Sequence, residues 1–221
     1  MRCIHCNQDT YLLKNGHRKC KKCKKKFSPQ KINKDIKIIE YFCEDFTAKE
    51  SSKKLGLNYV TVKRKFDTFR KIAALYLEKE YENKKEILEF EEYLYLEKSK
   101  RGDKKNIFDA YNFITFDYGG KIYNILMPDL SKYKNSFLQD GLQEVYYKEF
   151  ERFLKLNKII KLKSKNNLLK KFWLFFENSI TKYKGVNREN FFYYLKECEF
   201  KFNYPLKCKE ILKKLYLNKD F

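Results

Sequence analysis

The chain has 221 residues, enough for one ordinary domain and one or two small ones. Apolar residues make up 43% of it, with 20 Phe and 18 Tyr, so the composition excludes a disordered chain and can fill a core. The formal charge of +21 favours polyanions as partners, because released counterions drive association. The chain is also rich in Lys, Asn, Ile, Phe and Tyr, as A+T-rich coding sequences are, and this bias accounts for part of the charge.

The first residues contain no apolar segment of the kind found in a secretory leader. No window approaches the ~18 apolar residues of a membrane span, since the apolar run 172–176 is far too short. We therefore expect a cytoplasmic protein with no membrane partner. In that compartment, pairs of cysteines bind metal more often than they form disulfides.

Two Cys-x-x-Cys pairs open the chain: Cys3 with Cys6, and Cys20 with Cys23, separated by thirteen residues. Each pair can hold an ion from a tight knuckle, and two pairs complete a tetrahedron of thiolates. Between them, Asn15-Gly16 predicts a hairpin with a type I′ turn, in which both central residues have positive φ.

Two knuckles joined by a hairpin make a zinc ribbon, and we expect residues 1–29 to bind structural Zn²⁺. The alternative is one redox pair beside an accidental second pair. Asn7 tolerates the left-handed conformation expected after the first knuckle, whereas Lys24 suits it less well. The basic run 19–26 is either a solvated face or a phosphate contact. Three further cysteines have no metal-binding spacing and are expected to be apolar fillers: Cys43, Cys198 and Cys208.

Residues 30–84 predict a helix-turn-helix domain that ends in a connector helix. A first helix is expected over 33–43. Thr47, with Glu50 three residues later, has the pattern of a capping box, and the second helix should end at Leu55.

Gly56 then supplies the turn, and Asn58 is expected to cap the third helix. The third helix of such a unit can lie in the major groove of double-stranded DNA. A plain helical hairpin would show much of the same pattern. The candidate DNA-binding residues are Asn58 and the side chains expected to point outward: Tyr59, Thr61, Lys63, Arg64 and Lys65.

From Ile87 the pattern changes to strands. An alternating segment predicts a strand over 87–95, and a hairpin is expected from 106–116 and 121–127, joined by 117–120. Helices are expected over 143–156, 167–183, 191–202 and 208–217, with a short strand over 158–163. Strands followed by mixed helices suggest an α/β domain.

The last third of the chain resembles a known family. Asn167-Leu-Leu-Lys-Lys-Phe-Trp173, Lys182-Tyr-Lys-Gly185 and Glu197-Cys-Glu-Phe-Lys-Phe-Asn203 follow one another as in bacterial insertion-sequence transposases. Those proteins have a zinc ribbon, a helix-turn-helix and a DDE catalytic domain of ribonuclease-H-like fold, in that order. The resemblance spans nearly the whole chain and is weakest between about 96 and 165.

The resemblance implies cut-and-join chemistry at the ends of an element, with three carboxylates holding two divalent ions, Mg²⁺ or Mn²⁺. The first carboxylate lies on the first strand in an Asp-Glu pair, and Glu91-Glu92 stands there. The second lies in a Thr-Asp-Gly turn, which Gln139-Asp140-Gly141 matches. The resemblance thus assigns Glu91 and Asp140 as catalytic. It also implies homo-oligomers, because both element ends are held together.

The third acidic position is occupied by Lys170, whose ammonium would repel a metal ion and pair with the remaining carboxylates. Glu177 lies roughly 10 Å further along the helix, too far to substitute. A second threading makes 143–156 and 158–163 the elements before the second acid, so that Asp140 would not be that acid. In both threadings the catalytic centre is degenerate.

The expected fold is an α+β multidomain chain: a zinc ribbon over 1–29, a three-helix helix-turn-helix domain over 30–84, and a ribonuclease-H-like α/β transposase domain over 85–221. Three functions remain open. The first is a working transposase that cleaves and joins DNA. The second is a catalytically inactive DNA-binding regulator or relic. The third is a zinc-ribbon protein that binds RNA or a protein.

Overall fold

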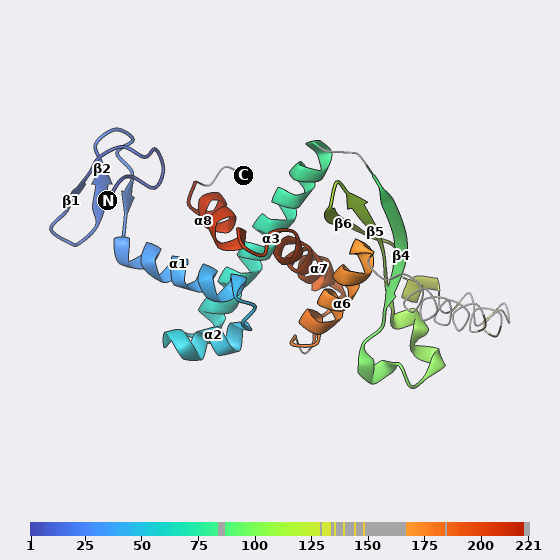
Figure 1. Ribbon diagram of the computed structural model, residues 1–221. Helices are drawn as coiled ribbons and strands as arrows, with labels where there is room; N and C mark the ends of the chain where they lie inside the picture. Colours follow the sequence, from blue (N-terminus) through green and yellow to red (C-terminus); the bar gives the residue numbers. More distant parts are fainter. Residues whose placement is uncertain are drawn as a thin grey trace. The chain divides into compact units, whose positions relative to one another are not determined.

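The computed structural model describes residues 1–83, 87–128, 130–133, 135, 139, 144, 148, 167–183 and 185–218 (Figure 1). These residues form an α+β structure with six α-helices and two three-stranded antiparallel sheets. They divide into a first unit, residues 1–80 and 178–221, and a second unit, residues 81–177. Asp140, the strand expected over 158–163 and most of the helix expected over 143–156 lie outside the described residues.

The small N-terminal sheet has the order β1-β2-β3, from Thr10–Leu12, Arg18–Cys20 and Lys26–Phe27. The hairpin expected at Asn15-Gly16 is present, but the type I′ turn is wrong. Only Gly16 has a positive φ, of 77°, and Leu13 N–H donates to the His17 carbonyl at 2.8 Å. The loop therefore has three residues and ends in a left-handed glycine, the next most common hairpin geometry.

Three helices follow the N-terminal sheet: α1 (Pro29–Cys43), α2 (Ala48–Leu55) and α3 (Tyr59–Asn83). Helix α1 begins four residues before the expected start, because Ser28 caps it and accepts the Lys31 N–H at 3.3 Å.

The signals that separate α2 from its neighbours are confirmed. Thr47 N–H donates to Glu50 at 2.8 Å, and Glu50 N–H donates to the Thr47 hydroxyl at 3.2 Å. Gly56 ends α2 in the left-handed conformation, with φ of 61°. The Asn58 side-chain oxygen accepts the Val60 N–H at 2.8 Å and so caps α3.

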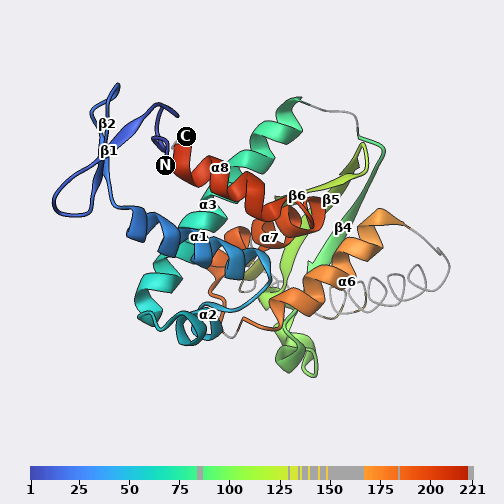
Figure 2. The same cartoon turned by 60° about the vertical axis from the view of Figure 1, so that its left-hand side comes forward.

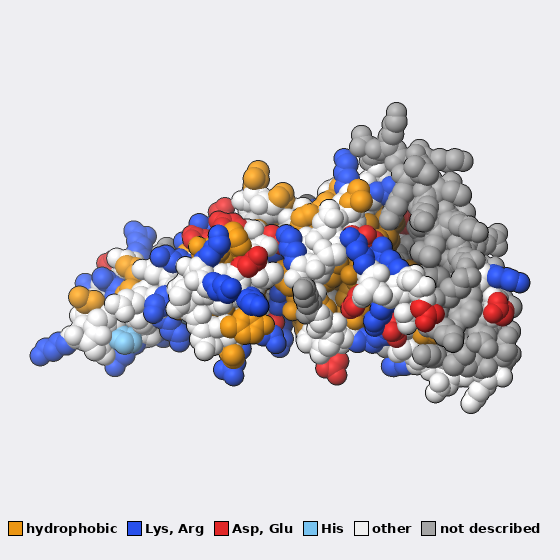
Figure 3. Space-filling model, turned by 90° about the horizontal axis from the view of Figure 1, so that it is seen from below, with side chains coloured by type: hydrophobic (Ala, Val, Ile, Leu, Met, Phe, Trp, Pro, Cys, Tyr) orange, Lys and Arg blue, Asp and Glu red, His pale blue; other side chains and the backbone are white. Residues whose placement is uncertain are grey.

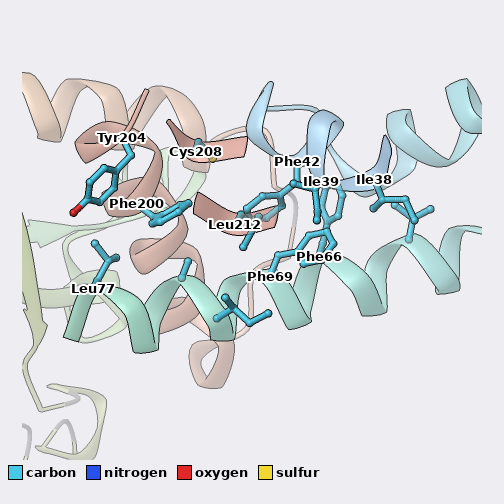
Figure 4. Packing of buried hydrophobic residues seen from close by; sticks show 13 residues of the cluster. Ile38, Ile39, Phe42, Phe66, Phe69, Leu77, Phe200, Tyr204, Cys208 and Leu212 are labelled. Carbon is cyan, nitrogen blue, oxygen red and sulfur yellow. The ribbon is translucent and has the colours of Figure 1, made fainter. Parts of the chain in front are cut away.

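The core of the first unit joins both ends of the chain (Figure 4). Phe42 of α1 and Phe66 and Phe69 of α3 are fully buried, and Phe42 meets the other two rings edge to face. Phe200 and Leu212, from the C-terminal helices α7 (Arg188–Asn203) and α8 (Cys208–Asn218), are buried in the same cluster.

Figures 1 and 2 both show α8 lying along α1. The structure thus groups residues 178–221 with the first three helices, whereas the sequence ranges placed them with the C-terminal domain. The physical reason is the apolar stripe formed by Phe200, Tyr204, Cys208 and Leu212, which is buried against α1 and α3.

The second unit contains a sheet of order β4-β5-β6, from Glu89–Tyr95, Tyr111–Tyr118 and Lys121–Leu126. The expected hairpin is confirmed: Tyr118 pairs with Lys121, and Gly119 and Gly120 both have positive φ. The first strand of this hairpin, β5, starts later than expected, because Lys104–Asp109 form a 3₁₀ helix.

Helix α6 (Leu168–Ile180) lies against this sheet. The Trp173 indole N–H donates to the Thr115 hydroxyl at 3.0 Å, and that hydroxyl donates to Asn124 at 2.8 Å. The Trp173 ring stacks on Tyr93 with 4.6 Å between centroids. A buried aromatic core thus fixes α6 on the sheet. Across the described parts of the chain, no helix has the length and hydrophobicity that crossing a bilayer requires.

Candidate metal centre and nucleic-acid interface

The four cysteines of the two Cys-x-x-Cys pairs come together, with all sulfur atoms within 4.8 Å of one another. The Cys3 and Cys23 sulfurs are 3.6 Å apart, and the Cys6 and Cys20 sulfurs are 3.4 Å apart. Thiolates about 2.3 Å from a zinc ion form a tetrahedron with edges of roughly 3.8 Å. The cluster therefore fits one metal ion such as Zn²⁺.

The backbone after each pair turns left-handed, at Asn7 (φ 54°) and at Lys24 (φ 59°). The turn expected at Asn7 is confirmed, and Lys24 adopts it although lysine suits it less well. Main-chain donors in the two knuckles point at the sulfurs. The N–H of His5 lies 3.4 Å from Cys3 Sγ, and that of Lys22 lies 3.3 Å from Cys20 Sγ.

The surroundings of Cys20 favour its thiolate. Burial raises the pKa of this thiol, but hydrogen bonds from the Cys23 backbone and from the Cys6 side chain outweigh burial and lower the pKa to about 6. A backbone hydrogen bond from Lys25 lowers the pKa of Cys23, but burial and hydrogen bonds with the other sulfurs outweigh it and raise the pKa to about 11, which keeps a proton within the cluster. The thiolate is the form that binds metal. Four sulfur ligands leave no coordination position for water, so the arrangement suits a structural ion rather than a catalytic one.

The first turns of α3 display most of the side chains expected to contact DNA. Tyr59 is 48% exposed, and Thr61, Lys63 and Arg64 are exposed as well. Asn58 is also exposed, but its side-chain oxygen is occupied in capping the helix. The opposite face is buried through Val62 and Phe66, so these turns have one inner and one outer side.

The prediction that Lys65 points outward is wrong. Its ammonium lies 2.8 Å from the Asp35 carboxylate and also contacts the Tyr216 hydroxyl. Position 65 lies three residues after Val62 and one before Phe66, at the edge of the buried stripe. The long lysine stem therefore reaches into the interior of the first unit, where Asp35 and Tyr216 hold its charge.

A buried ionic cluster connects α3 with α7, and the sequence analysis did not predict it. Arg70 Nε is 2.7 Å from Glu197 Oε2, and Lys201 Nζ is 2.5 Å from Glu197 Oε1. Lys201 also lies 3.1 Å from Asp45, which occupies the left-handed turn between α1 and α2. We call Arg70, Glu197, Lys201 and Asp45 the Glu197 network. It ties α3 and the turn after α1 to α7 through charged groups.

The sequence offers one signal for this network. Glu197 and Lys201 are four residues apart on one helix, the spacing of a side-chain pair. That spacing usually marks a solvated surface pair. Arg70, the third member, is 127 positions away from Glu197, so no local pattern shows that the pair is buried.

In the second unit, Glu91 lies on β4 and is half-buried. Burial raises the pKa of its carboxyl, and the positive charge of Lys170 opposes this rise without cancelling it. Lys170 is 8% exposed and lies on α6. The resemblance implied three catalytic acidic positions, and the structure brings two of them near each other. One carries the carboxylate of Glu91 and the other carries the ammonium of Lys170.

Glu177 has its own partners. It accepts hydrogen bonds from the Tyr93 hydroxyl at 2.5 Å and from Arg101 at 3.2 Å. Burial and the neighbouring carboxylate raise the pKa of Tyr93, so this phenol stays protonated and keeps donating. Glu177 therefore serves as an acceptor at the edge of the aromatic core around β4.

The chain matches no protein-family model, and comparisons with curated proteins and with solved structures find no match either.

Proposed function

We propose that this chain is a zinc-binding, DNA-binding protein of transposase descent, and that its helix-turn-helix binds double-stranded DNA. The observation that carries the proposal is the exposed N-terminal part of α3. There Tyr59, Thr61, Lys63 and Arg64 stand on a helix whose start is fixed by Asn58. A helix displayed in this way, after a short capped helix and a left-handed glycine, has the geometry of a recognition helix.

Further features support DNA as the partner. The formal charge of +21 favours a polyanion. Lys and Arg side chains are spread along the face seen from below, with acidic and apolar side chains between them (Figure 3). A four-cysteine metal centre at the start of the first unit would stabilise a ribbon that itself contains the basic run 19–26.

We propose binding without cleavage as the main activity, because of the pair Glu91 and Lys170. A two-metal centre concentrates negative charge to hold its ions. Here burial raises the pKa of the Glu91 carboxyl, and the positive charge of the buried Lys170 acts on the same carboxyl in the opposite direction. That ammonium offsets the negative charge which a divalent cation would need.

The test of binding uses the full chain with zinc and a labelled duplex from the DNA flanking its gene. We expect Arg64→Ala to weaken duplex binding at least about fivefold, as for loss of a base or phosphate contact. Lys79→Ala is the matched control, since Lys79 is exposed on the same helix more than ten residues away. Unchanged affinity in Arg64→Ala across a salt series would move the recognition surface elsewhere. A preference for RNA of the same sequence would favour an RNA-binding protein instead.

A working transposase is the second candidate, favoured by Glu91 on the first strand of the sheet, as the resemblance requires. It predicts nicking and joining of the flanking DNA with Mg²⁺ or Mn²⁺, lost in Asp140→Ala. Cleavage by the native chain would show that Lys170 does not prevent ion binding. Binding without cleavage in both chains would leave DNA recognition as the remaining function.

A further inference from the structure

A groove of about 500 Å³ lies in the first unit beside the exposed turns of α3. One wall comes from α2, with Lys49, Glu50 and Lys53, and another from α3, with Tyr59 and Lys63. The segment after α6 and the helix α7 complete it. Both ends of the chain therefore build this groove, and part of it is the surface already proposed to face DNA.

The groove carries unneutralised positive charge. Lys49, Lys53 and Lys63 are exposed, and within the described residues none of them has an ion-pair partner. The acid of the groove, Glu50, accepts hydrogen bonds from the N–H and the hydroxyl of Thr47, each at 2.8 Å. These bonds hold the Glu50 carboxylate at the start of α2, and no ion pair among the described residues joins it to the three lysines.

The Glu197 network holds one of the side chains that line the groove, Arg70. Arg70 reaches the groove but is held by Glu197 and by Asp67 at 2.8 Å. Its guanidinium lies 3.9 Å from the centre of the Tyr194 ring, against which it stacks. Arg70 is therefore held in place by protein partners before any anion enters, and the exposed lysines of the groove supply the contacts to the anion.

The groove also separates the exposed residues of α3 into two groups. Tyr59 and Lys63 are four residues apart, share one side of the helix and line the groove. Arg64 and Thr61 are exposed but do not line it. Contacts to the sugar-phosphate backbone position a protein on DNA, and contacts to base edges specify sequence. The two sides of α3 offer separate surfaces for these two kinds of contact.

We propose that this groove binds a phosphodiester segment of the DNA backbone through Lys49, Lys53 and Lys63, while Arg64 reads base edges. The inference rests on the proposed DNA binding and adds the location of the backbone contact. It also assigns a role to α7, whose Tyr194 supports the groove from the far end of the chain.

The experiment measures the affinity of the zinc-loaded full chain for duplex DNA over a series of salt concentrations. Native protein is compared with Lys49→Ala, Lys53→Ala and Lys63→Ala, and with Lys79→Ala as a control of equal charge change. Each groove variant should reduce the slope of log K against log salt by about 0.9, the value for one phosphate contact. The loss of affinity should be the same for the flanking duplex and for a scrambled duplex.

Arg64→Ala should instead reduce the preference for the flanking duplex over the scrambled one. If all three groove variants had the same salt slope as Lys79→Ala while the native chain still bound DNA, the groove would not be the site of the backbone contact. The proposed function would still stand. No binding by the native chain would overturn the proposed function itself. A free phosphate ion has the same chemistry as a backbone phosphate, so binding of inorganic phosphate is measured at constant ionic strength. The proposal would be overturned if phosphate bound saturably, if Lys53→Ala abolished that binding, and if the same variant left the salt slope for DNA unchanged. The groove would then be a site for small anions.

Discussion

Arg70 of α3 and Glu197 of α7 form a salt bridge of 2.7 Å with both side chains almost fully buried, at 4% and 1% exposure. Glu197 also accepts hydrogen bonds from Lys201 and from the Tyr183 hydroxyl. Both oxygens of this carboxylate therefore accept from protein donors. Such a cluster specifies one arrangement of α3 on α7, because a shifted helix would leave charges without partners.

Replacing Glu197 by Gln should strongly destabilise the first unit. The variant leaves Arg70 and Lys201 buried without their shared counter-charge, which costs about 3–5 kcal/mol in comparable sites. Urea unfolding followed by circular dichroism measures this loss. Glu189→Gln, at an exposed position of the same helix, should change the midpoint little. Equal midpoints for the two variants would contradict a stabilising role of the network.

The same carboxylate predicts a dependence of stability on pH. Burial raises the pKa of Glu197, but the charges of Arg70 and then Lys201 outweigh it and lower the value from 4.5 to about 2. The folded-state pKa is thus below the unfolded one, so the stabilisation is complete above pH 4.5 and is lost as the pH falls through 2. The free-energy difference between native protein and Glu197→Gln should therefore shrink between pH 4.5 and 2. Zinc loss in acid affects both proteins and cancels in the comparison.

Removing one cysteine ligand should unfold the N-terminal sheet without unfolding the helices. The buried apolar cluster beside that sheet contains only Cys3, Cys20, Phe27 and Ile32 among the described residues, so the metal should provide most of its stability. Cys20→Ser should lose the bound zinc, measured by elemental analysis, and the dispersed amide signals of residues 1–27. Cys43→Ser, outside the cluster, should retain one zinc per chain. Stoichiometric zinc in Cys20→Ser with an intact sheet would refute the site.

Phe200→Ala tests the role of the C-terminal helices in holding α1 and α3. Phe200 is fully buried in the core of the first unit, and truncating a buried Phe costs about 3–5 kcal/mol. Thermal unfolding should shift downward, and DNA affinity should fall at temperatures where the first unit begins to unfold. Leu206→Ala is the control, because Leu206 is 96% exposed. If Phe200→Ala matched Leu206→Ala in stability, α7 would not support these helices.

The features that the sequence predicted well are those encoded within a few residues. The capping box of Thr47 and Glu50, the left-handed Gly56 and the cap at Asn58 all depend on local backbone geometry. The spacing of the cysteines likewise indicates which sulfurs meet. The turn type at Asn15-Gly16 was predicted wrongly, because Asn15 suits both a type I′ turn and the three-residue loop that forms.

The features that the sequence did not predict depend on contacts between distant segments. Lys65 turns inward because Asp35 and Tyr216 lie there, and Tyr216 is 151 residues away from it. The burial of Glu197 requires Arg70 from another helix. The packing of α7 and α8 in the first unit follows from an apolar stripe that would suit any apolar partner. Helical periodicity shows that such a stripe is buried, but it does not show against which helix.

The first unit is assembled from the two ends of the chain, with residues 81–177 inserted between them in the sequence. During translation, Phe42, Phe66 and Phe69 emerge from the ribosome long before Phe200 and Leu212, which cover them in the folded protein, have been synthesised. During that interval the nascent N-terminal helices expose an aromatic surface, and the inserted segment is complete before the unit that it interrupts. Newly made chains should therefore depend on chaperones or rapid elongation until α8 emerges, and translation stalled after residue 177 should yield aggregation-prone products.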